Sequence, residues 1–196
     1  DVFAIKVTCA GARPVTGYLS LPKSRKPGDK YPAVVEFDGY GCGKMRPYDG
    51  GLGQREILFH INAHGYELEK EGDYYKEFND SISVDNTGYA FSEKQNAKPE
   101  TCYFLGMILR DVRAAQWAKT LPEWNGRDLI AWGGSQGGGM GLALMALDGR
   151  FRRGAVLVPA LTAHHCHRID GRQEGWPNLL LSQLPENEAA ASRNAP

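Results

Sequence analysis

Apolar and polar positions in the first part of the chain follow the pattern of β-strands. Residues 3–9 and 15–21 alternate apolar and polar side chains, and we expect these two strands to pair antiparallel. Two short apolar runs, residues 33–37 and 57–62, predict further strands. Residues 66–99 are polar and aromatic without a lasting period, so we predict a long functional loop there. We expect this loop, with Tyr74, Tyr75 and Tyr89, to form the wall of the substrate pocket.

The rest of the chain alternates helices with strands. Apolar residues recur at helical spacing over residues 101–121, and Pro122 ends the pattern. A strand at 128–132, a helix of small residues at 136–147 and a strand at 153–158 are predicted to follow.

This order of elements predicts the fold class. Strands that alternate with helices are joined by right-handed crossovers, which gives a mainly parallel sheet. We therefore expect one α/β domain over residues 1–196, with three layers and an antiparallel N-terminal edge. The order is typical of the α/β-hydrolase fold.

The composition of the chain limits the classes of binding partner but identifies no particular one. Hydrophobic residues make up 42% of the 196 residues, and 23 basic residues balance 23 acidic ones. A chain with this balance of charge has no excess of basic residues that would indicate binding to nucleic acid or to an anionic membrane. No apolar run approaches the ~20 residues of a membrane span. The four cysteines form no C-x-x-C pair, so we expect no metal site or dithiol motif, only buried thiols. They leave the compartment open between periplasmic or secreted and cytoplasmic.

The clearest chemical motif is Gly133-x-Ser135-x-Gly137, between a predicted strand and a predicted helix. This pattern is typical of a nucleophile elbow, a sharp turn that lifts a serine hydroxyl above the sheet. We expect Ser135 to be the nucleophile of a serine esterase, with backbone N–H groups of Gln136 and Tyr40 as oxyanion donors. Nucleotide-binding proteins also have Gly-rich turns, but no P-loop or G-x-G-x-x-G follows the first strand.

Several motifs are spread over nearly the whole chain. They are Phe37-Asp38-Gly39-Tyr40-Gly41, Asn62-Ala63-His64-Gly65-Tyr66, Tyr103-Phe104-Leu105-Gly106-Met107 with Arg110 and Arg113, Gly133 to Gly138, and Arg172-Gln173-x-Gly175-Trp176-Pro177. Together they resemble the acetyl xylan esterase and cephalosporin C deacetylase family of α/β-hydrolases. The resemblance implies removal of acetyl groups from xylo-oligosaccharides or other small acetylated alcohols by a Ser-His-Asp triad, without metal or cofactor. It is also compatible with a homo-oligomer, because relatives work as hexamers.

Two features depart from that family's pattern. The first glycine-rich loop usually begins with His, where this chain has Asp38, which weakens any role for that side chain but not for the Tyr40 N–H. In this fold the acid and then the base follow the serine. The residues after Ser135 include Asp148 and Asp170, but His164, His165 and His167 precede or crowd the only acid available. We therefore expect the domain over residues 1–196 to be incomplete, without the C-terminal strands of the fold, and the acid and base to lie beyond Pro196. The chain alone is then expected to be weakly active or inactive.

Other interpretations of the same residues stay open. The histidine cluster around Cys166 could suggest a metal site, but adjacent residues on an extended segment point apart, so we favour a polar loop. His64 precedes the serine and is interpreted as a structural histidine. The fold also hosts general carboxylesterases and peptidases. A non-catalytic carbohydrate-binding module is the alternative outside enzymes, with aromatic residues stacking on sugar rings; the candidates are Tyr74, Tyr75, Trp124 and Trp176.

Overall fold

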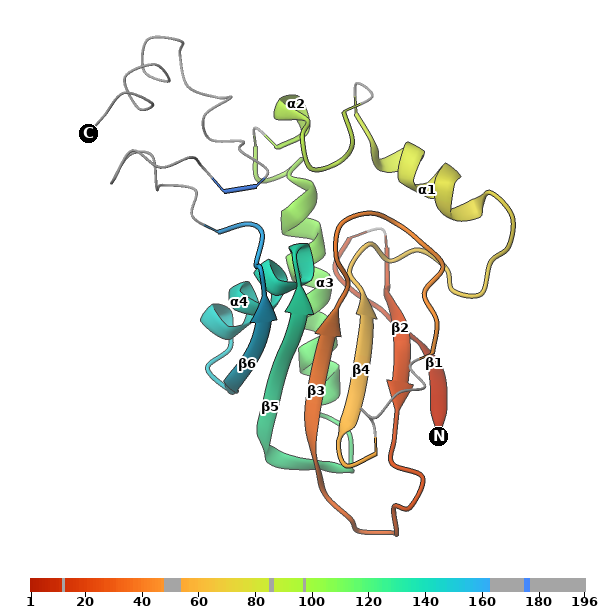
Figure 1. Ribbon diagram of the computed structural model, residues 1–196, viewed down its shortest axis with the longest axis vertical. Helices are drawn as coiled ribbons and strands as arrows, with labels where there is room; N and C mark the ends of the chain where they lie inside the picture. Colours follow the sequence, from red (N-terminus) through yellow and green to blue (C-terminus); the bar gives the residue numbers. More distant parts are fainter. Residues whose placement is uncertain (12, 48–53, 85–86, 97, 163–174, 177–196) are drawn as a thin grey trace, which may run out of the picture.

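A six-stranded mixed sheet forms the centre of the computed structural model, which describes residues 1–11, 13–47, 54–84, 87–96, 98–162 and 175–176. Its strand order is β1-β2-β4-β3-β5-β6 (Figure 1). The strands are β1 (Val2–Val7), β2 (Val15–Ser20), β3 (Tyr31–Phe37), β4 (Ile57–Asn62), β5 (Trp124–Gly134) and β6 (Phe151–Leu157). All six predicted strands are present, and β5 begins four residues earlier than expected because Trp124 pairs with Tyr31.

The pairing of the strands confirms the predicted antiparallel edge. β1 pairs antiparallel with β2, and β2 antiparallel with β4, while β3 runs parallel to both β4 and β5, and β5 parallel to β6. The parallel strands therefore end at one common edge of the sheet. That edge carries the loop after β3, the loop after β4 and the turn after β5 (Figure 1).

Two long helices pack on one face of the sheet (Figure 1). They are α3 (Tyr103–Ala118) and α4 (Gln136–Leu147), within a few residues of the predicted spans. The Trp117 ring of α3 meets the Phe59 ring of β4 edge-to-face at 5.0 Å. Three layers were expected, but within the described residues the sheet has a helical layer on this face alone. No helix of those residues is long and apolar enough to cross a membrane.

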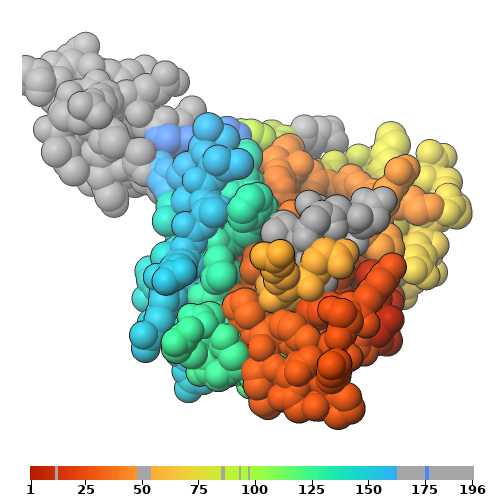
Figure 2. All heavy atoms as spheres, turned by 60° about the horizontal axis from the view of Figure 1, so that its bottom comes forward, coloured from red at the N-terminus to blue at the C-terminus, as the bar shows by residue number. Residues whose placement is uncertain are grey.

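The segment 66–99, expected to be a loop, contains two helices, α1 (Tyr74–Ile82) and α2 (Glu93–Asn96). The loop prediction was wrong because α1 is only nine residues long and buries few of them. Its packing decides its structure, since the Tyr66 ring meets Tyr75 and Phe78 of α1 edge-to-face. Figure 2 shows α1 (yellow) on the flank opposite α4 and β6 (teal to blue).

Candidate active site

Ser135 lies at the sharp turn between β5 and α4. Its backbone has φ 52° and ψ −122°, an unfavourable conformation for a residue with a Cβ. Three main-chain hydrogen bonds hold this conformation: Ser135 N–H donates to Leu157 O at 2.9 Å, and Ser135 O accepts from Gly139 N–H and Ala160 N–H. The Ser135 side chain is exposed. The turn therefore has the backbone geometry expected of a nucleophile elbow.

Glycines make this turn possible by letting main chains approach each other. A Cβ on Gly137 would lie 2.1 Å from the Phe37 carbonyl oxygen, and one on Gly133 would lie 2.6 Å from the Gly137 carbonyl carbon. Real Cβ contacts are never this short. The end of β3 consequently lies directly against the first turn of α4, beside Ser135.

Gln136 begins α4 and is 1% exposed. The first N–H groups of a helix have no acceptor within the helix and carry its positive dipole end. The Gln136 carboxamide accepts a hydrogen bond from the Tyr89 hydroxyl at 2.8 Å and donates to the Gly39 carbonyl at 3.4 Å. Its side chain therefore contacts the loop after β3.

Tyr40 lies in that loop, between Gly39 and Gly41. Its ring is 47% exposed and stacks on the buried Tyr89 ring, with centroids 5.0 Å apart. Gly41 has φ +98°, a left-handed conformation that suits glycine, and its N–H donates to the Tyr89 hydroxyl at 3.1 Å. The structure thus brings the loop of Tyr40 and the start of α4 together.

Asp38 forms an ion pair that could not be read from the sequence. Its Oδ1 lies 2.8 Å from His60 Nε2 of β4, and Glu36 is the register partner of His60 across β3 and β4. Burial opposes a charged imidazole at His60, but the hydrogen bond and charge of Asp38 and the charge of Glu36 raise its pKa overall. Burial raises the pKa of Glu36. Because Asp38 is bonded to His60 of β4, it holds the start of the Tyr40 loop against the sheet.

His64 is a structural histidine in its contacts, as the sequence suggested. It is 4% exposed, and its Nδ1 lies 3.0 Å from the Tyr103 hydroxyl. Burial, followed by the positive charges of Arg110 and Arg13, lowers the pKa of His64 to about 3, so the ring stays neutral. Within the described residues, no hydrogen bond joins Ser135 to either His60 or His64.

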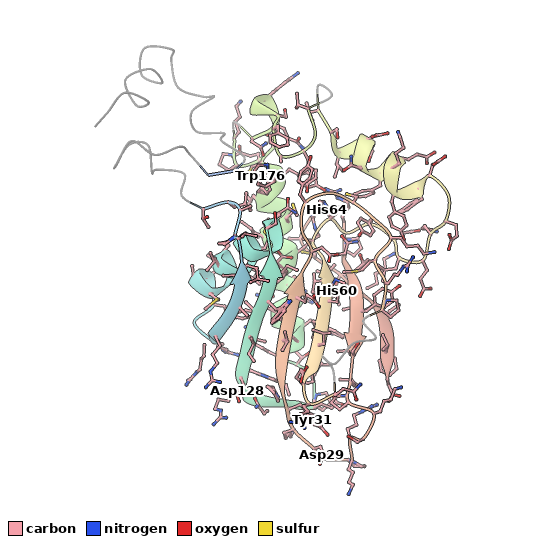
Figure 3. All side chains as sticks on the ribbon, in the orientation of Figure 1. Asp29, Tyr31, His60, His64, Asp128 and Trp176 are labelled. Atoms are coloured by element: carbon pink, nitrogen blue, oxygen red, sulfur yellow. The ribbon has the colours of Figure 1, made fainter. Side chains whose placement is uncertain are left out.

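An aromatic cluster of Tyr40, Phe91 and Trp176 lies near the elbow. The rings meet in pairs, with centroids 5.3 Å apart for Tyr40 and Trp176 and 5.6 Å for Phe91 and Trp176. The Trp176 carbonyl oxygen accepts a hydrogen bond from the Leu161 N–H. The preceding residue, Ala160, donates its N–H to the Ser135 carbonyl oxygen. Tyr40 and Phe91 are 47% and 41% exposed, so the aromatic cluster presents apolar ring surface to solvent. Figure 3 shows Trp176, His64 and His60 toward the edge of the sheet at which the parallel strands end. Asp29, Tyr31 and Asp128 lie at the opposite end of the sheet.

The Tyr40 loop also borders a cleft of about 580 Å³. Residues 38–47 line it together with His60 and Tyr66, whose hydroxyl donates to the Gly43 carbonyl at 2.7 Å. Neither Ser135 nor Gln136 lines this cleft. A second cleft, of about 500 Å³, involves Asp1 and residues 25–30 and lies far from the elbow.

Several residues named from the sequence lie outside the described residues: His164, His165, Cys166, His167, Asp170, Arg172, Gln173 and Pro177. Asp148 is described, and it forms an ion pair with Lys119 at the far end of α4. The three described cysteines are free and partly buried rather than fully buried, and burial raises the pKa of Cys42 to about 12. In the described part of the chain, no cluster of His, Cys, Asp and Glu could hold a metal ion.

His60 was missed from the sequence, whereas Tyr89 was named with Tyr74 and Tyr75 only as a candidate for the wall of the pocket. Nothing in the aperiodic segment signalled that Tyr89 bonds to Gln136. His60 is hidden in an apolar run. Their contacts with Gln136 and Asp38 join residues 47 and 22 positions apart, so only the folded chain reveals them.

The parallel strands, the strained serine after β5 and the helix that follows it define an α/β-hydrolase fold. Solved structures agree: the chain matches the acetyl xylan esterase from Paenibacillus sp. R4 with a TM-score of 0.69 and 19% identity, over 98% of this chain and 61% of that one. It matches acetyl xylan esterase 1 from Thermoanaerobacterium sp. JW/SL YS485 with a TM-score of 0.64 and 16% identity, over 98% of this chain and 65% of that one.

Sequence comparison identifies the family. Residues 1–172 match the family model for acetyl xylan esterase (AXE1). The chain is 28% identical over 182 residues to the acetyl esterase Axe7A of Xylanibacter ruminicola, which covers 91% of this chain and 40% of that protein. The chain belongs to the acetyl xylan esterase family, and it spans between two fifths and two thirds of the length of these three relatives.

Proposed function

We propose that this chain carries the nucleophile and the oxyanion hole of an acetyl esterase. The observation that carries the proposal is the turn at Ser135, a strained serine at a helix N-terminus with the loop of Tyr40 packed against it. Strain of this kind costs about 1–3 kcal/mol and is found mainly at functional sites. Membership of the acetyl xylan esterase family supports the same chemistry.

The proposed reaction proceeds through an acyl-enzyme. Ser135 Oγ bonds to the acetyl carbonyl carbon and gives its proton to a base, while the carbonyl electron pair moves to the oxygen. The N–H groups of Gln136 and Tyr40 donate to this oxyanion. Collapse of the intermediate breaks the bond to the alcohol, which leaves with the proton, and water then releases acetate by the same steps.

Residues other than those described are proposed to supply the acid and the base. Among the described residues, His60 is paired with Asp38, His64 is bonded to Tyr103, and Asp148 is paired with Lys119. In this fold the acid and the base follow the serine along the chain.

The proposed substrates are acetylated xylo-oligosaccharides or other small acetylated alcohols. Axe7A and the two matched structures are named as acetyl or acetyl xylan esterases. The exposed rings of Tyr40 and Phe91, with Trp176, offer an apolar surface on which a sugar ring can stack. A small acyl group and a sugar alcohol suit this region better than a charged ligand does.

The proposal is tested by labelling the full-length protein with a fluorophosphonate probe and by assaying acetylated xylobiose, p-nitrophenyl acetate, p-nitrophenyl butyrate and a chromogenic dipeptide. We expect labelling that Ser135→Ala abolishes, and the highest kcat/KM on acetyl esters. Preference for butyrate or the dipeptide would instead indicate a general carboxylesterase or a peptidase. Sugar binding without labelling would indicate a carbohydrate-binding module and contradict the proposal.

A further inference from the structure

A ring of hydrogen bonds connects the two segments that carry the proposed oxyanion donors. The Gly41 N–H donates to the Tyr89 hydroxyl at 3.1 Å, and that hydroxyl donates to Gln136 Oε1 at 2.8 Å. Gln136 Nε2 then donates to the Gly39 carbonyl at 3.4 Å. Gly39 and Gly41 are the two neighbours of Tyr40, so the backbone of Tyr40 closes the ring.

Burial makes this ring rigid. Tyr89 is 0% exposed and Gln136 is 1% exposed, so water does not compete for these bonds. The Tyr89 ring lies between Tyr40 and Tyr103, with centroids 5.0 and 4.7 Å away. The hydroxyl of Tyr89 is used once as donor and once as acceptor, which fixes which way the Gln136 amide points.

An oxyanion hole depends on the separation of its two donors, which must both reach one oxygen at 2.7–3.1 Å. Gln136 supplies one N–H, while its own side chain bonds to the carbonyl next to Tyr40. We infer that the Tyr89 hydroxyl and the Gln136 carboxamide are positioning groups that hold the Gln136 and Tyr40 N–H groups at the separation required by the oxyanion. This inference rests on the proposed function.

The inference predicts a loss confined to the transition state. The oxyanion forms only as the ester is attacked, so a displaced donor lowers kcat and leaves KM nearly unchanged. Removing one donor costs about 10²–10³ in kcat. Because Tyr89→Phe loosens a donor without removing it, we expect kcat to fall about 10- to 100-fold.

The matched control is Tyr103→Phe. Tyr103 is also a buried tyrosine, 6% exposed, and its hydroxyl bonds to His64 and Arg13 rather than to either oxyanion segment. Both substitutions delete one buried hydroxyl, so both are expected to lower Tm by similar amounts. Only Tyr89→Phe is expected to lower kcat, and Tyr103→Phe should keep kcat within about threefold of the parent.

The experiment measures kcat and KM on p-nitrophenyl acetate, inhibition by a trifluoromethyl ketone, and Tm, all in the full-length protein. Weaker inhibition of Tyr89→Phe supports the inference, because the ketone forms a tetrahedral oxyanion on serine. Gln136→Met keeps the Gln136 N–H but breaks the ring, and it serves if Tyr89→Phe does not fold. We expect the same selective loss of kcat in this variant.

The outcomes separate the inference from the proposed function. If the parent shows no turnover that depends on Ser135, the proposed function fails first. If the parent is active and kcat of Tyr89→Phe and Gln136→Met equals that of Tyr103→Phe, the positioning role is overturned. A proportional loss of kcat and Tm in all three variants also overturns it, because that result indicates a purely structural effect.

Discussion

Gly137→Ala is the sharpest test of the packing at the elbow. The added Cβ would lie 2.1 Å from the Phe37 carbonyl oxygen and 2.7 Å from the Asp38 carbonyl oxygen. Restoring even a 3.0 Å contact requires β3 or α4 to move by about 0.9 Å. Both neighbours are backbone atoms, so no side-chain rotation can relieve the contact.

Two effects oppose each other in this substitution. Alanine is favoured over glycine inside a helix by about 1 kcal/mol, which would stabilise α4. Overpacking a rigid site typically costs about 1–3 kcal/mol and sometimes more, and here the contact is with two carbonyl groups. We expect the contact to prevail, with a net loss of about 2 kcal/mol in the free energy of unfolding and a Tm lower by about 4–8 °C.

Gly134→Ala provides the control within the same turn. Its Cβ would meet nothing closer than the Leu157 carbonyl oxygen at 3.9 Å, an ordinary contact. Urea unfolding followed by circular dichroism should therefore place Gly134→Ala within about 1 kcal/mol of the parent. If Gly137→Ala is as stable as Gly134→Ala and equally active, the close packing of β3 on α4 is refuted.

Three further predictions concern the backbone strain at Ser135, the pair of Asp38 and His60, and the position of the catalytic base. Ser135→Gly should be more stable than Ser135→Ala by about 1 kcal/mol in urea unfolding, since glycine tolerates φ 52°; equal stability would argue against strain. Asp38→Asn should lower the pKa of His60 in an NMR titration, because it removes the negative charge of Asp38 that helps to raise that pKa. Because the pKa of His60 is raised in the folded state, the pair stabilises the parent fully below the unfolded-state pKa of His60. This stabilisation is lost as the pH rises through the folded-state pKa. An unchanged His60 titration in Asp38→Asn would contradict the ion pair. Residues 1–196 alone should hydrolyse p-nitrophenyl acetate about 10⁴-fold more slowly than a complete triad allows, whereas rapid turnover would point to His164, His165 or His167 as the base.

The local pattern of the chain was enough to predict most of its elements. The helix α3 has apolar positions at a sustained helical spacing, and the turn at Ser135 has glycines flanking a serine between a strand and a helix. These signals depend on neighbours in sequence, and they survive folding because tertiary packing uses the same apolar faces. The helix α1 was missed because nine mostly polar residues give too short a period.

The sequence by itself determined the strands, the two long helices and the elbow with its serine. Only the tertiary structure decided that β4 lies between β2 and β3, that His60 pairs with Asp38, and that Tyr89 bonds to Gln136. The physical reason is that these contacts join residues far apart along the chain. No local propensity encodes them, and their geometry is fixed only when the sheet brings the loops after β3 and β5 to one edge.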